Sequence, residues 1–351
     1  MITLEELADG AGSLELSPAG RPVEPLALVD LDGPGSPAAA LAAAQAAATA
    51  QRVLIGVGKG PLDPVLAPVA EALVFTLVPL AEEGGSRALV GVDDPVAAAG
   101  AVAAYANAWP IAAVTLTGLL RLTERLGVPD GLFAESSAYS MLLAGPEFAG
   151  WRARTPRRPA DDGAGAAAGP EPVLLEREGP VLRIALNRPA RHNAFSRGVR
   201  DGLVEALELA RLDPTVARVE LSGNGPSFCS GGDLDEFGTT PDVTAAHLIR
   251  LRRSAGHAVH HCAERVRVRV HGACIGAGIE IPAFAGRVEA RGDAYFQLPE
   301  LRMGLVPGAG GTVSVTRRIG RWRTAYLVLS GERVDAATAL RWGLVDACAD
   351  L

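Results

Sequence analysis

The chain has 351 residues, 48% hydrophobic and 21% charged, which predicts a packed core and excludes a largely disordered protein. Its net charge of −7 excludes a general nucleic-acid binder, because such proteins need a basic face to displace counterions from phosphates. Lys59 is the only lysine, so arginine supplies nearly all of the positive charge, and its planar fork can hold a phosphate in two places.

The sequence lacks the usual marks of a metal-binding, secreted or membrane protein. Its four cysteines have no CxxC spacing, which predicts neither a zinc site nor a disulfide framework and is consistent with a reducing cytoplasm. The N-terminus is acidic and lacks the basic-then-apolar order of a signal peptide. The apolar stretches are too short or too interrupted to span a membrane. We therefore expect a cytoplasmic protein with no metal site and no membrane partner.

The first half, residues 1–155, is predicted to be an accessory domain. Residues 25–80 read as an abbreviated strand, helix, strand, helix and strand, and residues 88–155 read as a series of helices. In the last of these helices, Glu135, Tyr139, Leu142 and Leu143 fall on one face. Residues 156–172 are rich in Pro, Gly and Ala without an apolar period, which predicts a linker.

The second half, residues 173–351, alternates strands and helices, which indicates α/β units with right-handed crossovers. Its first two strands are joined by Gly-Pro and predict a hairpin, and the helix that follows places Val199, Leu203, Ala206, Leu207 and Ala210 on one stripe. The predicted strands are Val173–Glu176, Val181–Leu186, Ala217–Ser222 and Val266–Val270, and the predicted helices are Arg197–Leu212, Ala245–Glu264 and Gly278–Phe284.

Four segments of this half carry glycines and glutamates in an ordered series, and a fifth follows them. They read LNRPARHNAF, GPSFCSGGDLDEF, VHGACIGAGIEI and FQLPELRMGLVPGAGGT, with Arg318–Asp346 as the fifth. In this order they resemble the crotonase, or enoyl-CoA hydratase/isomerase, superfamily. The resemblance implies an α/β protein with a crotonase-like ββα spiral and an N-terminal accessory α/β or helical domain.

The resemblance assigns an oxyanion hole and a pair of acid–base groups. A thioester that becomes an enolate needs fixed hydrogen-bond donors for its oxygen, and the family takes them from two backbone N–H groups, here those of Gly232 and Ala277. We expect Ala277 to open a helix whose dipole adds positive charge there. Hydratases of the family have glutamates at the positions of Glu280 and Glu300, and a shared buried setting separates the pKa values of such a pair into an acid and a base.

The remaining site residues are also implied by the resemblance. Arg191 is a candidate phosphate partner, and Gly308 is expected to help orient the water. The predicted substrate and CoA contacts are Arg191, Asn193, Ala194, Ser230, Asp233, Leu234 and Gly308. No cofactor is expected, since CoA is part of the substrate. The family implies a homo-oligomer, a trimer or a hexamer.

The sequence leaves three functions open. The glutamate pair favours a lyase that adds water to an enoyl-CoA or removes it. An enoyl-CoA isomerase, or a cofactor-independent dioxygenase that acts on aryl-acetyl-CoA, would use the same oxyanion hole. A non-catalytic acyl-CoA-binding partner is the third alternative.

The first half suggests a further hypothesis about its role. Crotonases continue beyond the segment GLVD with helices that cover the active site, and residues 88–155 resemble that terminal section. We therefore interpret residues 1–155 as a degenerate crotonase-like repeat that supplies the covering helices, with an unrelated accessory domain as the alternative.

Overall fold

The computed structural model describes residues 1–33, 35–157, 171–240 and 242–349. Its N-terminal strands pair in parallel in the order β1-β2-β3-β4, which confirms the strand and helix alternation predicted for residues 25–80. The strands are β1 Leu26–Asp30, β2 Val53–Val57, β3 Phe75–Pro79 and β4 Leu89–Val92. The helices are α1 Leu4–Glu6, α2 Pro37–Thr49, α3 Ala67–Ala72, α4 Pro95–Ala108, α5 Pro110–Thr123, α6 Val128–Leu143 and α7 Pro146–Arg154.

The N-terminal sheet is buried on both faces, as parallel sheets require. All five residues of β2 are buried, because successive side chains point to opposite faces and each face is covered. Leu54 packs into a small core with the alanines of α2, whose short side chains let the helix lie close to the sheet. Val53, Ile55 and Val57 point the other way, into the main core of the molecule.

The C-terminal half is built on a six-stranded sheet of order β13-β10-β8-β7-β6-β5 and a three-stranded sheet of order β12-β11-β9. The strands are β5 Val173–Glu178, β6 Val181–Leu186, β7 Arg218–Gly223, β8 Val266–Val270, β9 Ala273–Ile275, β10 Arg287–Arg291, β11 Tyr295–Gln297, β12 Val334–Asp335 and β13 Ala347–Ala349. The helices are α8 Arg197–Leu212, α9 Val243–Arg252, α10 Ala255–His261, α11 Ala277–Glu280, α12 Gly311–Ser330 and α13 Ala336–Trp342. The β5–β6 pair is antiparallel, so the predicted hairpin is confirmed.

Local periodicity accounts for how this half buries one face of its large sheet. In β8 the valines at 266, 268 and 270 are buried, while Arg267 and Arg269 between them are exposed. Helix α8 buries the five residues of the stripe predicted from its sequence. Each fully buried Val or Leu side chain contributes roughly 1.5–3 kcal/mol, so these matched stripes fix α8 against the sheet.

Two predicted helices differ from the structure. The helix expected over Ala245–Glu264 is broken into α9 and α10, because Ser254 takes an extended conformation and its side chain caps the backbone N–H of His257. The helix expected over Gly278–Phe284 is only α11, which is followed by a 3₁₀ turn at Pro282–Phe284. Pro282 has no N–H to continue the α-helical bonding, which ends α11 early.

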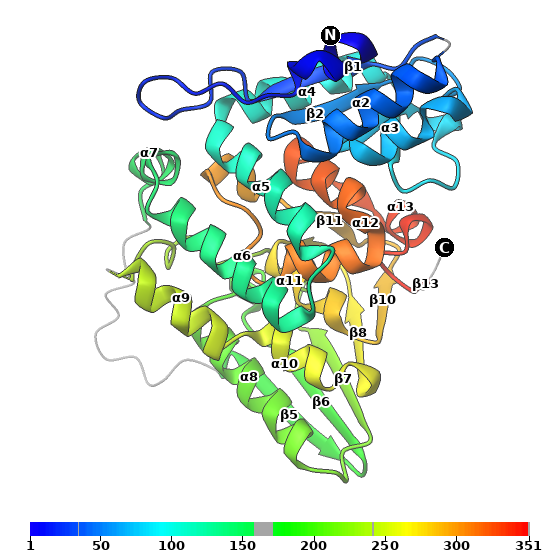
Figure 1. Cartoon of the computed structure of the whole chain (residues 1–351). Coiled ribbons are helices and arrows are strands. Elements are labelled where there is room, and N and C mark those ends of the chain that lie inside the picture. Colours follow the sequence, from blue (N-terminus) through cyan, green and yellow to red (C-terminus); the bar gives the residue numbers. More distant parts are fainter. Residues whose placement is uncertain (34, 158–170, 241, 350–351) are drawn as a thin grey trace.

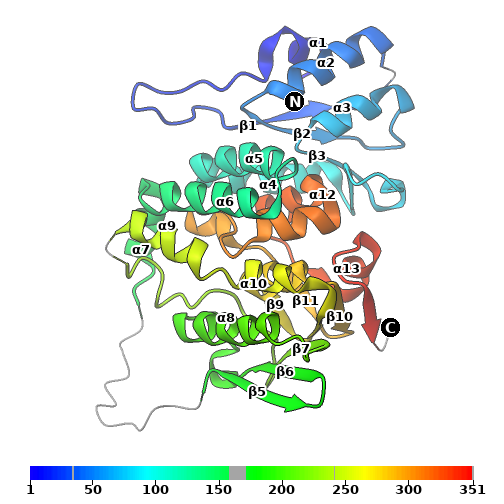
Figure 2. The ribbon, with the colours of Figure 1, turned by 60° about the horizontal axis from the view of Figure 1, so that its bottom comes forward.

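The two halves share one core (Figure 1). Helices α5 and α6 pack against α12, and α6 also packs against α9. Thr123 of α5 donates to the carbonyl of Thr312 at 2.8 Å, and Trp342 donates to Glu83 at 2.6 Å. In the view of Figure 2, α4, α5 and α6 lie beside α12, between the N-terminal sheet and most of the other elements that follow residue 171. Most of the predicted linker, residues 158–170, lies outside the described residues.

Among the described residues, no single helix is long and apolar enough to cross a membrane. Helices α4 and α5 meet this length and composition only when they are taken together, and the chain bends by 108° between them.

We predict that residues 170–351 expressed alone are insoluble or poorly folded. Without residues 1–155, the apolar face that α12 turns toward α5 would be exposed, at roughly 1.5–3 kcal/mol for each large side chain. Circular dichroism and a hydration assay on the purified fragment would measure this. A stable, active fragment would contradict the covering role of the first half, and that role stays a prediction until then.

Candidate active site

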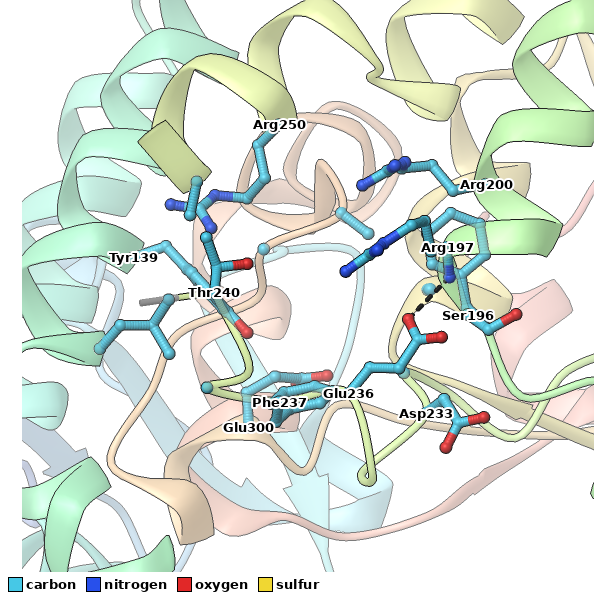
Figure 3. Close-up of a pocket in the computed structure, with 18 of the residues that line it drawn as sticks. Tyr139, Ser196, Arg197, Arg200, Asp233, Glu236, Phe237, Thr240, Arg250 and Glu300 are labelled. Carbon is cyan, nitrogen blue, oxygen red and sulfur yellow. Dashed lines mark hydrogen bonds between the residues drawn. The ribbon is translucent and has the colours of Figure 1, made fainter. Parts of the chain in front are cut away.

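A cavity of about 340 Å³ lies between the halves and is lined by residues from both (Figure 3). Helix α6 contributes Tyr139 and Leu143, and α7 contributes Phe148. The C-terminal half contributes residues at the start of α8, in the loop before α9, along α9 and around α11. Six of the predicted site residues line this cavity, namely Gly232, Asp233, Ala277, Glu280, Glu300 and Gly308.

The carboxyl groups of Glu280 and Glu300 both lie close to the backbone of Gly276. Glu280 is the last residue of α11, and Glu300 opens a short 3₁₀ turn, Glu300–Met303. A Cβ atom placed on Gly276 would lie 2.6 Å from Glu300 Oε1 and 3.6 Å from Glu280 Oε1. Gly276 also has a φ of +50°, a left-handed conformation that favours glycine. Glycine at this position therefore allows two carboxyl groups, 20 residues apart in sequence, to face one space.

Burial makes both carboxyl groups hard to ionise. Their exposed fractions are 2% for Glu280 and 7% for Glu300. Burial raises the pKa of Glu280 to about 7, against the lowering effect of backbone N–H groups that bond to it. Burial and the neighbouring Glu280 charge raise the pKa of Glu300 well above its usual value. Glu300 Oε2 is also buried without a partner among the described residues. Glu300 is thus the better candidate to carry a proton, and Glu280 to be the carboxylate.

Two residues of the cavity lining have a backbone N–H group with no recorded acceptor among the described residues. These are the N–H groups of Gly232 and Ala277. Their segments are joined, since Ile275 donates to the carbonyl of Cys229 at 3.0 Å and Cys229 donates to that of Ala273 at 3.1 Å. An oxyanion hole needs two free N–H groups beside one cavity, and the assignment of this role to Gly232 and Ala277 stays a prediction.

The helix behind Ala277 is shorter than the sequence predicted. Because α11 has only four residues, few peptide dipoles align behind the N–H of Ala277. The contribution that we expected from a helix dipole is therefore small, and an oxyanion bound here would depend mainly on the N–H groups themselves.

A third carboxyl group, that of Glu135 in α6, holds the loop beside the pair. Glu135 accepts from the N–H of Gly310 at 2.7 Å and from the N–H and hydroxyl of Thr312 at 2.9 and 2.7 Å. Glu280 Oε2 accepts from the alternate N–H groups, those of Ala309 at 2.8 Å and Gly311 at 2.9 Å. The loop of residues 308–312 is thus clamped between one glutamate from each half of the chain.

Burial and the nearby Glu280 charge raise the pKa of Glu135 to about 8. Sequence reasoning placed Glu135 on a helical face with Tyr139 but gave it no role in the site. A glutamate on the otherwise apolar face of α6 was the available signal.

The predicted CoA contacts are not all in the cavity wall. Arg191, Asn193, Ala194, Ser230 and Leu234 lie outside its lining. Arg191 forms ion pairs with Asp233 at 3.2 Å and Asp235 at 2.7 Å. Asn193 is fully buried and ties the backbone of its loop to Asn224 and Ser227. The roles of these residues in binding CoA stay predictions.

Three arginines that sequence reasoning missed also line the cavity (Figure 3). Arg197 and Arg200 lie at the N-terminal end of α8. Arg250 lies on α9, with its guanidinium over the ring of Tyr139. The sequence predicted the helices that carry these arginines. It did not indicate which arginines on those helices face a cavity and which face solvent.

Comparison with known proteins gives a consistent result for the C-terminal half. A family model described as enoyl-CoA hydratase/isomerase matches residues 176–350. The 2,3-dehydroadipyl-CoA hydratase of Escherichia coli is 35% identical over 49% of this chain and 67% of its own length. The mitochondrial enoyl-CoA hydratase of Pongo abelii is 32% identical over 50% of this chain and 61% of its own length.

A solved structure of an enoyl-CoA hydratase from Thermoplasma volcanium is 29% identical, with a TM-score of 0.48 over 52% of this chain and 73% of that one. The chain spans only 61–67% of the length of the two curated relatives.

Proposed function

Because this chain belongs to the enoyl-CoA hydratase/isomerase family of enzymes, we propose that it adds water to an enoyl-CoA, or removes it in reverse. The observation that carries the proposal is the pairing of Glu280 and Glu300 across Gly276 beside two unpartnered N–H groups. An isomerase needs one carboxyl group to move a proton. A hydratase needs two, because it must both activate a water and protonate carbon.

In the proposed reaction, the thioester oxygen lies between the N–H groups of Gly232 and Ala277. The carboxylate of Glu280 takes a proton from a water as the water oxygen bonds to C3 of the enoyl group. The C2–C3 electron pair moves toward the thioester, and the two N–H groups stabilise the resulting enolate oxygen. Glu300 then gives its proton to C2, and the product is a 3-hydroxyacyl-CoA.

The pKa directions support this division of roles. The N–H groups of Ala309 and Gly311 stabilise the charged form of Glu280. No recorded donor stabilises Glu300 Oε2 within the described chain, and burial raises the pKa of Glu300. One proton shared by the pair then rests on Glu300 before water attacks. Besides these groups of the protein, only the substrate and water take part in the proposed steps.

CoA would leave the cavity past the start of α8. Arg197 and Arg200 are the cationic side chains nearest that route in the cavity wall. Arg191 is already paired with two aspartates, so it would have to exchange a carboxylate for a phosphate to bind CoA directly. Asp233, held by Arg188 and Arg191, would keep the loop of Gly232 in place.

The test is to incubate the protein with crotonyl-CoA and a panel of longer and aryl enoyl-CoAs in ¹⁸O-labelled water, with mass spectrometry of the products. We expect one labelled water to be added. A double-bond shift without added mass would support the isomerase alternative, and incorporation of molecular oxygen would support the dioxygenase. No turnover of any substrate would favour a non-catalytic acyl-CoA-binding role.

A further inference from the structure

Arg250 brings a positive charge to the cavity and forms no recorded ion pair among the described residues, and the carboxyl group that acts on its charge is that of Glu135. Arg250 lies near the C-terminal end of α9, with its guanidinium carbon 4.8 Å from the centre of the Tyr139 ring (Figure 3). Its Nε donates to Ser136 Oγ at 3.2 Å, and its Nη2 donates to Ser140 Oγ. None of the ion pairs recorded for the described residues includes Arg250, and its Nη1 has no recorded acceptor among them.

Two other arginines near the site, Arg188 and Arg191, are neutralised by carboxylates, whereas Arg197 also lines the cavity without a recorded ion pair among the described residues. Arg188 pairs with Asp233 at 3.1 Å, and Arg191 pairs with Asp233 and Asp235. Arg250 is only partly exposed, and a partly buried charge without an ion pair is costly. The serines hold two of its nitrogens in place but offer no negative charge, so Nη1 is left to bind an anion from the cavity.

The position of Arg250 relative to the reacting groups is fixed by contacts. The N–H of Ala309 binds Glu280, and the preceding residue, Gly308, lies against the Tyr139 ring. A Cβ atom on Gly308 would be 2.4 Å from that ring. Arg250 lies on the same ring. An acyl chain that passes Glu280 and continues along Tyr139 therefore comes to Arg250.

The wall between these points suits a hydrocarbon chain. Leu143, Val243 and Ala246 line the cavity near Arg250, so methylene groups would meet apolar side chains before the guanidinium. Arg197 and Arg200 lie in the first turn of α8, next to its N-cap residue Ser196, on the side of Asp233 and away from Tyr139 (Figure 3). The cavity thus has one cationic wall at the start of α8 and a separate cation at Arg250.

We infer that Arg250 binds a carboxylate at the far end of the acyl chain, so that the preferred substrates are CoA thioesters of unsaturated dicarboxylic acids. The inference rests on the proposed hydration for its kinetic test but not for its binding test. Arg250 is a specificity residue in this assignment, because its guanidinium contacts the substrate away from the reacting carbons.

The kinetic test compares trans-2-hexenedioyl-CoA with trans-2-hexenoyl-CoA, which differ only in a terminal carboxylate or methyl group. We expect kcat/KM of the intact protein to be higher for the diacid. Arg250→Met should lower kcat/KM for the diacid by about 100-fold and for the neutral substrate by less than about 3-fold, since only the diacid loses a charge-assisted bond. Arg252→Met, an exposed arginine on the same helix, is the matched control.

A second variant separates charge from packing. Ser140→Ala removes one acceptor that holds Arg250 against α6 but keeps the cation. It should preserve the preference for the diacid. If Arg250→Met lowers kcat/KM equally for both substrates, Arg250 binds CoA or serves only packing, and the inference is overturned. It is also overturned if the intact protein hydrates the neutral substrate equally well.

Calorimetric binding tests the inference if no substrate is hydrated. Saturated hexanedioyl-CoA and hexanoyl-CoA do not react, so their affinities depend only on recognition. Tighter binding of the diacid that is lost in Arg250→Met would uphold the carboxylate site while the proposed hydration fails. Equal affinities would reject the site whatever the reaction.

Discussion

We expect Glu300→Gln and Glu280→Gln each to lower kcat for crotonyl-CoA hydration by about 10³-fold, the typical contribution of a positioned acid or base. Glutamine keeps the shape of each side chain but can neither give nor take the proton. The double variant should be little slower than either single variant, because the pair acts as a unit. Rates come from the loss of enoyl thioester absorbance, with product mass as confirmation.

Two controls would show whether the loss of kcat comes from the missing acid or base rather than from a damaged fold. Glu236→Gln changes another carboxylate of the cavity wall, one that is exposed and binds the N–H of Arg197, and it should keep kcat within about 3-fold. The Glu300→Gln variant should also be no less stable than the wild type at pH 8. Activity within tenfold of wild type in either catalytic variant would remove that glutamate from the mechanism.

The sign of the stability control follows from the raised pKa of Glu300. Above about pH 4.3, Glu300 ionises in the unfolded chain but stays protonated in the folded protein. The folded state thus binds more protons, and the free energy of unfolding falls as pH rises until the folded pKa is passed. Glutamine does not ionise, so Glu300→Gln should gain stability over the wild type as pH rises through this window.

The fold could be predicted wherever one element carries its own period. Helix α8 has the predicted bounds and the predicted buried residues, and β8 has its predicted bounds. Prediction was wrong where a single side chain breaks the period. Ser254 caps a new helix inside an apolar stretch that otherwise reads as continuous, and Pro282 ends α11 after one turn. Such breaks are local hydrogen-bond effects that apolar spacing does not record.

The site divides in the same way. Glu280, Glu300, Gly232 and Ala277 were identified by resemblance to a family pattern, and the structure brings all four to one cavity. Glu135 and Arg250 could not be placed from the sequence. Glu135 is 175 residues from Gly310, to which it bonds, and that contact depends on how α6 lies across α12. Patterns among neighbouring residues do not predict a contact between residues so far apart in the sequence.

Glu135→Ala should lower the free energy of unfolding by about 3 kcal/mol or more and reduce kcat by about 10–100-fold. The stability loss follows because alanine leaves the N–H groups of Gly310 and Thr312 and the hydroxyl of Thr312 buried without their acceptor. The loss of kcat follows because the freed loop also carries the N–H groups of Ala309 and Gly311, which hold Glu280. Denaturant unfolding and steady-state kinetics measure the two effects.

KM is the measurement that distinguishes positioning from binding. Glu135 does not line the cavity, so KM should change by less than about 3-fold while kcat falls. Thr312→Val removes one of the three bonds to Glu135 and is the graded control, with a smaller loss of both stability and kcat. If Glu135→Ala lost stability but kept kcat, the hydrogen bonds from Gly310 and Thr312 to Glu135 would serve only to join the two halves. The expected 10–100-fold fall in kcat without a change in KM would instead show that the N-terminal half orders the catalytic loop.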